Sequence, residues 1–286
     1  MILTEGNKVK DELVLDDWID LNRNIIFKDS KQMEKVAPFP PADLMSNVSG
    51  LIDNKDFASH GCDIYLALNN ASDIPLTDFT KVLDFGCGCG RLARMFKAHD
   101  NELYGCDLDP RHIKWIQDNL DYMNAMVSDV HPPLPYNDNF FDAIISVSIF
   151  THLNESSQDE FLRDLHRIAK QNSRLLITVH GAMAIEKAIN NSQTRDLLCM
   201  DEDAFQQAVV SFNDDKHGFV LQQGHLTTSN ADGNDIVNSP FEYGISFISE
   251  NYIKSHWGKW FEIVDYSHGA IHEFQDIVVL EPREMR

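Results

Sequence analysis

The residues best suited to chemistry follow a short apolar segment, VLDF over 82–85, which we interpret as a buried strand. A glycine turn, GCGCG over 86–90, comes next, and a helix is expected over 91–98. Glycines let the backbone bend sharply and approach a ligand, and the helix N-terminus behind them offers free N–H groups. A dinucleotide site would have its third glycine at position 91, where this chain has Arg91. Asp84, two positions before the turn, suits a ligand with an ammonium group better than a pyrophosphate.

Two more carboxylates follow the next two predicted strands. Asp107 comes roughly 20 residues after the glycines, where an acidic group can accept the hydroxyls of a ribose. Asp129 follows a short strand at 125–127 and could accept the exocyclic amine of an adenine. The carboxyl ends of parallel strands line one cleft, so three acids after one glycine turn are a stronger signal than the turn alone.

The elements that must position these residues follow an alternating pattern. Apolar strands and amphipathic helices alternate from 81 to 179, as an α/β fold with a parallel sheet requires. The last two strands, 261–266 and 275–280, are expected to form an antiparallel hairpin at a sheet edge. We therefore predict a Rossmann-like, mostly parallel sheet of seven strands. A helical N-terminal cap is expected over 1–75, and the sheet domain over 76–286 with an inserted lid at about 182–240.

The segment 80–180 resembles the class I S-adenosylmethionine (SAM)-dependent methyltransferases of the methyltransferase-domain superfamily. The motifs that carry the resemblance are LDFGCGCGR over 83–91 and FDAIISVSIFTHL over 141–153. The resemblance extends over most of 38–282, except for about 182–240. It implies SAM as cofactor and S-adenosylhomocysteine as product. The residues implied to bind SAM are Asp84, Gly86, Cys87, Gly88 and Gly90 for the methionine part, Asp107 and Leu108 for the ribose and adenine, Asp129 and Val130 around the adenine, and Ser146 and Val147 beneath the sulfonium.

Two histidines are candidates for the general base, because they follow strands four and five and the cleft lies beyond such strand ends. These are His152 and His180, whose imidazole pKa is ordinarily close to working pH. His152 can also be a structural histidine that bonds to the loop, and His180 can instead bind the acceptor. Four further residues are expected to line the acceptor pocket, with packing or loop anchoring as the alternative: Phe39, Tyr136, Glu242 and Tyr243.

The expected reaction is methyl transfer to a hydroxyl oxygen of a small polar metabolite or sugar, by in-line displacement. An N- or carboxyl-methyltransferase and a non-catalytic SAM-binding subunit stay open as alternatives. Arg91 and the lack of a Tyr-x-x-x-Lys pair argue against a nicotinamide oxidoreductase on the same sheet.

Composition and charge exclude further classes of binding partner. The 286 residues carry a formal net charge of −21 and no Lys/Arg cluster, so nucleic acid is an unlikely substrate. No apolar run approaches a membrane span and the N-terminus does not look like a secretory signal, which predicts a cytoplasmic protein that does not enter membranes. The five cysteines lack paired metal-ligand spacing, so neither a metal site nor a disulfide framework is expected. A monomer or homodimer is expected.

Overall fold

The computed structural model describes residues 12–25, 29–222 and 241–284, and divides into two compact units, 1–127 and 128–286. Seven strands form a mostly parallel sheet with antiparallel C-terminal strands, so the predicted fold class is confirmed. The first unit contributes the strands in the order β3-β2-β1, and the second unit those in the order β4-β5-β9-β8.

In the first unit, three parallel strands carry the predicted glycine turn and acidic strand ends. Asp109 caps α5, its side chain accepting the N–H of Arg111, and Pro110 occupies the first helical turn. The elements are α1 (Glu12–Arg23), α2 (Ser30–Met33), α3 (Ala42–Ser49), α4 (Asn54–Ala71), η1 (Leu76–Asp78), β1 (Lys81–Phe85), η2 (Ala93–Ala98), β2 (Glu102–Asp107), α5 (Pro110–Asn119) and β3 (Met123–Val127).

The helix expected over 91–98 is instead a 3-10 helix, η2, that starts at Ala93. Its hydrogen bonds span three residues, from Met95 N–H to Leu92 O and from His99 N–H to Phe96 O. Five of its six residues are buried, so no exposed polar face marks it as an amphipathic α-helix.

In the second unit, β5 runs parallel to β4 and antiparallel to β9, which pairs antiparallel with β8. This confirms the predicted C-terminal hairpin. Asn154 caps α6 by accepting the N–H of Ser157. The elements outside the insertion are β4 (Phe141–Ser146), α6 (Glu155–Ile168), β5 (Ala169–Val179), α10 (Glu250–His256), η3 (Trp257–Lys259), β8 (Phe261–Ile271) and β9 (Gln275–Pro282).

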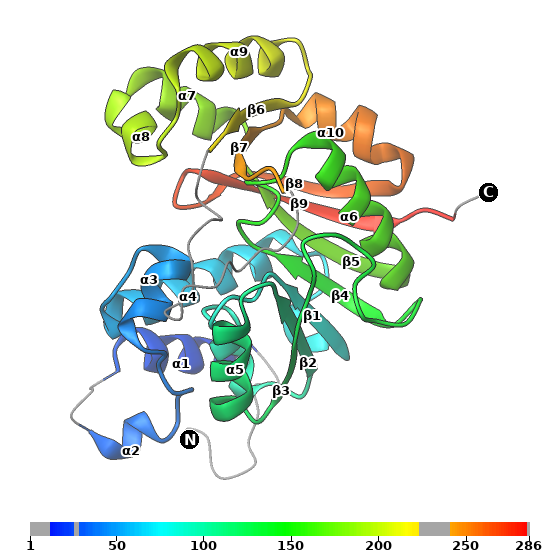
Figure 1. The fold of residues 1–286 in the computed structure, drawn as a ribbon. Coiled ribbons are helices and arrows are strands. Elements are labelled where there is room, and N and C mark those ends of the chain that lie inside the picture. The colour runs from blue at the N-terminus through cyan, green and yellow to red at the C-terminus, as the bar shows by residue number, and fades with distance from the viewer. Residues whose placement is uncertain (1–11, 26–28, 223–240, 285–286) are drawn as a thin grey trace. The chain divides into compact units, whose positions relative to one another are not determined.

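The described part of the predicted insertion is more regular than the sequence indicates. Figure 1 shows α7 and α9 beside β6, which pairs antiparallel with β7 just after the insertion. Buried residues of these four elements, among them Phe205 and Phe247, form a separate hydrophobic cluster. The elements are α7 (Ala182–Asn190), α8 (Ser192–Leu197), α9 (Glu202–Asn213), β6 (Gly218–Leu221) and β7 (Gly244–Phe247). Residues 223–240 of the predicted lid lie outside the described residues.

No helix within the described ranges has the length and apolar character needed to cross a lipid bilayer.

Candidate active site

The glycine turn adopts a backbone that other residues rarely reach. Gly86, Gly88 and Gly90 have φ values of 76°, 52° and 87°, in the region that glycine tolerates best. A Cβ on Gly88 would lie 2.6 Å from Cγ2 of Val48 on α3. The turn therefore needs glycine both for its backbone and for its close packing.

The amide groups of the turn bind mainly to protein atoms. The N–H groups of Gly86 and Cys87 donate to Cys106 O at 2.9 and 3.1 Å, and Gly90 N–H donates to Cys87 O at 2.9 Å. The turn is thus fixed against β2. Its contribution to a ligand site is mainly room for close approach rather than these three donors.

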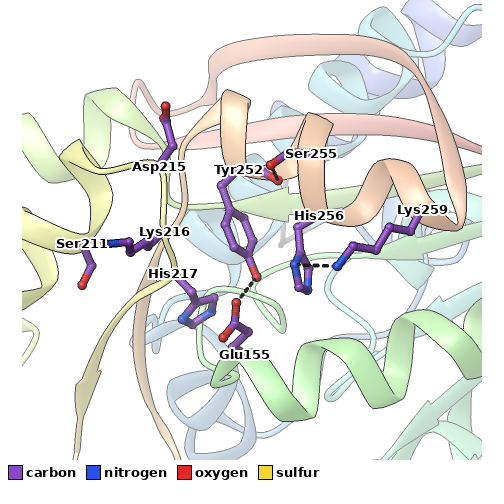
Figure 2. A pocket seen from close by; sticks show the side chains of 9 residues that line it. All are labelled: Glu155, Ser211, Asp215, Lys216, His217, Tyr252, Ser255, His256 and Lys259. Atoms are coloured by element: carbon purple, nitrogen blue, oxygen red, sulfur yellow. Dashed lines mark hydrogen bonds between the residues drawn. The ribbon is translucent and has the colours of Figure 1, made fainter.

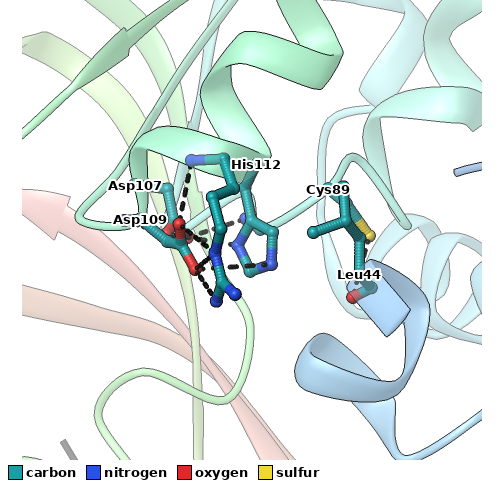
Figure 3. A network of polar contacts seen from close by, with 7 residues as sticks. Leu44, Cys89, Asp107, Asp109 and His112 are labelled. Atoms are coloured by element: carbon teal, nitrogen blue, oxygen red, sulfur yellow. Dashed lines mark hydrogen bonds and ion pairs between the residues drawn. The ribbon is translucent and has the colours of Figure 1, made fainter. Parts of the chain in front are cut away.

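Asp107, at the end of β2, is tied directly to the turn. Its Oδ2 accepts the N–H of Gly88 at 2.8 Å and its Oδ1 accepts the N–H of Asp109 at 2.9 Å. Figure 3 shows this network, in which the buried His112 places Nδ1 3.6 Å from Asp107 Oδ1. Each carboxylate oxygen has a further lone pair, which could accept a ribose hydroxyl. Leu108 follows and is half-buried.

Asp84 is a buried acid with an unused oxygen. The residue is 3% exposed, and within the described residues Oδ2 has no hydrogen-bond partner. Burial raises the pKa of Asp84 to about 7, against the lowering effect of Arg91, while Asp107 raises it further. A buried polar atom without a partner is uncommon, and an ammonium group would satisfy this one.

Arg91 supplies a buried cation near this acid. Burial lowers the pKa of its guanidinium to about 10, and Asp84 opposes that shift. Its Nη1 lies 3.0 Å from Nδ1 of His60 on α4. Asp84 and Arg91 together complement the ammonium and carboxylate of an amino-acid group, so the first unit fits the methionine part of SAM. The arginine that argued against a dinucleotide site is therefore a site candidate itself, a role that the spacing analysis did not assign.

Phe39, predicted to line the acceptor pocket, packs in the first unit against a cluster that includes Leu44 and Phe57. The guanidinium of Arg94 lies 3.6 Å from the centre of its ring. Arg94 also donates to Ala37 O at 2.7 Å and to Pro38 O at 3.1 Å. Sequence reasoning missed Arg94, although a lone arginine within the apolar run of 92–96 is an available signal. The acceptor role of Phe39 stays a prediction.

In the second unit, His152 lies against β7. Its Nδ1 is 2.9 Å from Gly244 O, and because a carbonyl oxygen only accepts, Nδ1 carries the proton. Its ring stacks on Tyr243 with centroids 4.6 Å apart and an angle of 12° between planes. Tyr243 is in turn bridged to Leu153. Two residues predicted from different segments are thus brought together.

His180 also contacts β7 and is 3% exposed. Its ring donates a hydrogen bond to the backbone of Ser246, and among the described residues its Nδ1 has no hydrogen-bond partner. Burial lowers the pKa of His180 to about 3, and the nearby His152 lowers it further. The two predicted catalytic histidines therefore lie near each other, and both are held by carbonyl groups of one strand.

The other predicted residues of the second unit have protein contacts of their own. Asp129 Oδ1 accepts the N–H of Val130 at 2.7 Å. Glu242 Oε2 accepts from Asn154 Nδ2 at 2.7 Å, so Glu242 anchors the start of α6. Its expected role in the acceptor pocket stays a prediction.

Tyr136 is buried and meets Phe141 edge to face, with centroids 4.9 Å apart. Ser146 and Val147, at the end of β4, are also buried. Within the described part of the chain, Ser146 Oγ has no hydrogen-bond partner. Thr151 Oγ1 shares that property, and sequence reasoning did not single Thr151 out.

Residues 83–177 match the family model described as "Methyltransferase domain". Ajmaline N-methyltransferase of Rauvolfia serpentina is 27% identical over 106 residues, which are 35% of this chain and 35% of that protein. A tRNA (carboxymethyluridine(34)-5-O)-methyltransferase of Arabidopsis thaliana is 32% identical over 102 residues, 35% of this chain and 24% of that protein. The matches thus span about a third and a quarter of these relatives.

Solved structures share the fold at low sequence identity. A Pyrococcus horikoshii protein has a TM-score of 0.51 at 12% identity, over 73% of this chain and 84% of its own. A putative SAM-dependent methyltransferase of Listeria monocytogenes has a TM-score of 0.50 at 11% identity, over 78% and 99%. Residues 83–177 thus match a methyltransferase domain, and they form part of a mostly parallel sheet of seven strands.

Proposed function

We propose that this chain transfers the methyl group of SAM to a hydroxyl oxygen of a small polar molecule, such as a metabolite or sugar. The observation that carries the proposal is the buried Asp84, whose Oδ2 has no partner among the described residues, beside a glycine turn that Asp107 holds. SAM, when bound, supplies a methyl group that is already activated. The protein then has to bind SAM, orient the acceptor molecule and remove the proton from its hydroxyl group.

Three side chains of the first unit each bind a different part of the cofactor. Ionised Asp84 takes the ammonium group, and Arg91 takes the carboxylate. Asp107 accepts hydrogen bonds from the ribose hydroxyls with the lone pairs that Gly88 and Asp109 leave unused. These roles account for the burial of both a carboxylate, Asp84, and a guanidinium, Arg91, near one turn.

His152 is the proposed general base. Because Nδ1–H donates to Gly244 O, the lone pair resides on Nε2, and stacking on Tyr243 fixes the ring plane. A positioned imidazole of this kind contributes about 10²–10⁴-fold to proton transfer. Burial lowers the pKa of His180 to about 3, so it is a weaker base than an ordinary imidazole. Its neutral Nδ1 is suited to accept a hydrogen bond from the acceptor molecule.

The net charge supports a small molecule over a nucleic acid. One relative is named for tRNA, but a chain with a formal charge of −21 repels a phosphate backbone unless a basic patch offsets it.

An amine acceptor is the second candidate, favoured by the low pKa of His180 and by the relative named as an N-methyltransferase. A neutral amine already has its lone pair and needs no base.

Calorimetry with SAM, S-adenosylhomocysteine and NAD tests the cofactor, and methyl transfer to panels of alcohols and amines tests the acceptor. We expect binding of SAM and S-adenosylhomocysteine but not of NAD. With an alcohol acceptor, His152→Gln should lower turnover about 10²-fold or more and leave the SAM dissociation constant unchanged.

Three results would count against the proposal in different ways. Absence of SAM binding removes the cofactor assignment. Unchanged turnover in His152→Gln indicates an amine acceptor or another base. SAM binding without transfer to any acceptor supports the non-catalytic subunit.

A further inference from the structure

The second unit contains a pocket that the proposed reaction does not use. Its volume is about 480 Å³, within the range of small-molecule sites. The start of α6, the turn after α9, α10 and η3 all contribute to its walls (Figure 2). The residues that line it are Glu155, Ser211, Asp215, Lys216, His217, Tyr252, Ser255, His256 and Lys259.

One wall is formed by side-chain hydrogen bonds between the helices α6 and α10. Residues four apart on α10 bond to residues four apart on α6: Tyr252 OH donates to Glu155 Oε1 at 2.8 Å, and His256 Nε2 lies 2.7 Å from Asp159 Oδ1. The rings of Tyr252 and His256 stack at 4.8 Å. These contacts fix the wall, so the pocket is preformed.

One end of the pocket accepts hydrogen bonds. A ring N–H of His217 donates a hydrogen bond to the backbone of Leu153. Within the described ranges, Nε2 of His217 has no hydrogen-bond partner. Burial lowers the pKa of His217 to about 4, although Glu155 nearby raises it. Since Tyr252 uses Oε1, Glu155 Oε2 can accept as well. This end therefore suits a ligand group that donates hydrogen bonds, above all an ammonium.

The other end is cationic. Lys259 Nζ lies 3.3 Å from His256 Nδ1 and 5.8 Å from the centre of the Trp260 ring. No carboxylate forms an ion pair with Lys259 among residues 12–25, 29–222 and 241–284. Lys216, by contrast, pairs with Asp214 at 3.1 Å. In the view of Figure 2, His256 separates Lys259 from Glu155.

We propose that this pocket binds a small zwitterion, with its ammonium at Glu155 and His217 and its carboxylate at Lys259. Both ends then gain charge-assisted hydrogen bonds, and the buried Nε2 of His217 gains a partner. Because His256 lies between the two ends in Figure 2, an ω-amino acid with its charges several bonds apart fits better than an α-amino acid.

The test is a titration of the full chain, followed by NMR of ring-labelled histidines, with glycine, β-alanine, 4-aminobutanoate and 6-aminohexanoate. We expect saturable shifts of the His217 and His256 signals, strongest for one of the longer chains. Butylamine and butanoate, each with one charge, should bind more weakly. Lys259→Met should weaken binding about five-fold, as expected for a partly exposed ion pair.

The matched control is Lys254→Met, which removes an exposed lysine of α10 that pairs with Glu250 at 2.6 Å and does not line the pocket. It should leave the affinity unchanged. No shift with any probe up to about 50 mM, well above weak millimolar affinity, overturns the proposal. Equal binding of butylamine or butanoate, or an equal loss in Lys254→Met, also overturns it. SAM binding stays intact in every case, so this test is independent of the proposed reaction.

Discussion

Asp84→Asn is expected to flatten the dependence of stability on pH. Burial raises the pKa of Asp84 to about 7 in the folded protein, whereas an aspartate in the unfolded chain titrates near 3.9. Between these values the folded state holds a proton that the unfolded state has lost. Stability is therefore highest at low pH and falls as the pH rises through the folded pKa.

The size of the effect follows from those two pKa values. One pH unit of such a difference corresponds to about 1.4 kcal/mol. From pH 5 to pH 8, the free energy of unfolding should fall by about 2.5 kcal/mol on account of Asp84 alone. Asparagine cannot titrate, so the variant should lack this part of the slope while all other groups contribute as before.

Urea denaturation of the wild-type chain and Asp84→Asn at pH 5, 6, 7 and 8 measures the difference in slope. The slope is compared rather than the absolute stability, because the substitution also leaves the buried Arg91 without its carboxylate. Asp118→Asn, which removes an exposed carboxylate that pairs with Lys114, is the control and should keep the wild-type slope.

SAM affinity provides a second measurement on the same variants. Since the ionised carboxylate binds the ammonium group, wild-type affinity should rise as the pH passes 7, and Asp84→Asn should bind weakly throughout. Parallel pH–stability curves for the wild type and Asp84→Asn would refute the reasoning, because they would show that the acid is ionised in the folded protein over the whole range.

Arg94→Met should lower the free energy of unfolding by about 3 kcal/mol, because it removes charge-assisted bonds from a buried guanidinium to the carbonyls of Ala37 and Pro38. Lys97→Met, at a half-buried site with similar bonds, should cost less, and equal losses in urea denaturation would contradict this. Gly88→Ala should weaken SAM binding in calorimetry, since its Cβ would meet Val48; adding Val48→Ala should restore part of it, and no recovery would assign the loss to backbone strain alone. Phe205→Ala should cost about 3–5 kcal/mol and raise hydrogen exchange in α7, α9, β6 and β7, which share its cluster; exchange that rises equally in β4 and β5 would show that the cluster does not open separately.

Local sequence was sufficient for the sheet and for the positions of the glycine turn and Asp107 at its strand ends. The strand before the glycine turn, the turn itself and Asp107 are close in sequence, so strand period, glycine tolerance and spacing placed them correctly. The C-terminal hairpin was predictable for the same reason. Each of these features depends on residues within one or two neighbouring elements.

Tertiary structure decided what depends on burial and on distant partners. Asp84 could be named from the sequence, but its raised pKa arises from its surroundings in the folded chain. His152 and His180 each donate to a carbonyl of β7, more than 60 residues further along, and spacing along the chain does not report such partners. Likewise, β6 was not predicted, because a four-residue strand is stable only when its partner in β7 is present. Spacing along the chain reports local geometry, whereas protonation and long-range pairing are properties of the packed interior.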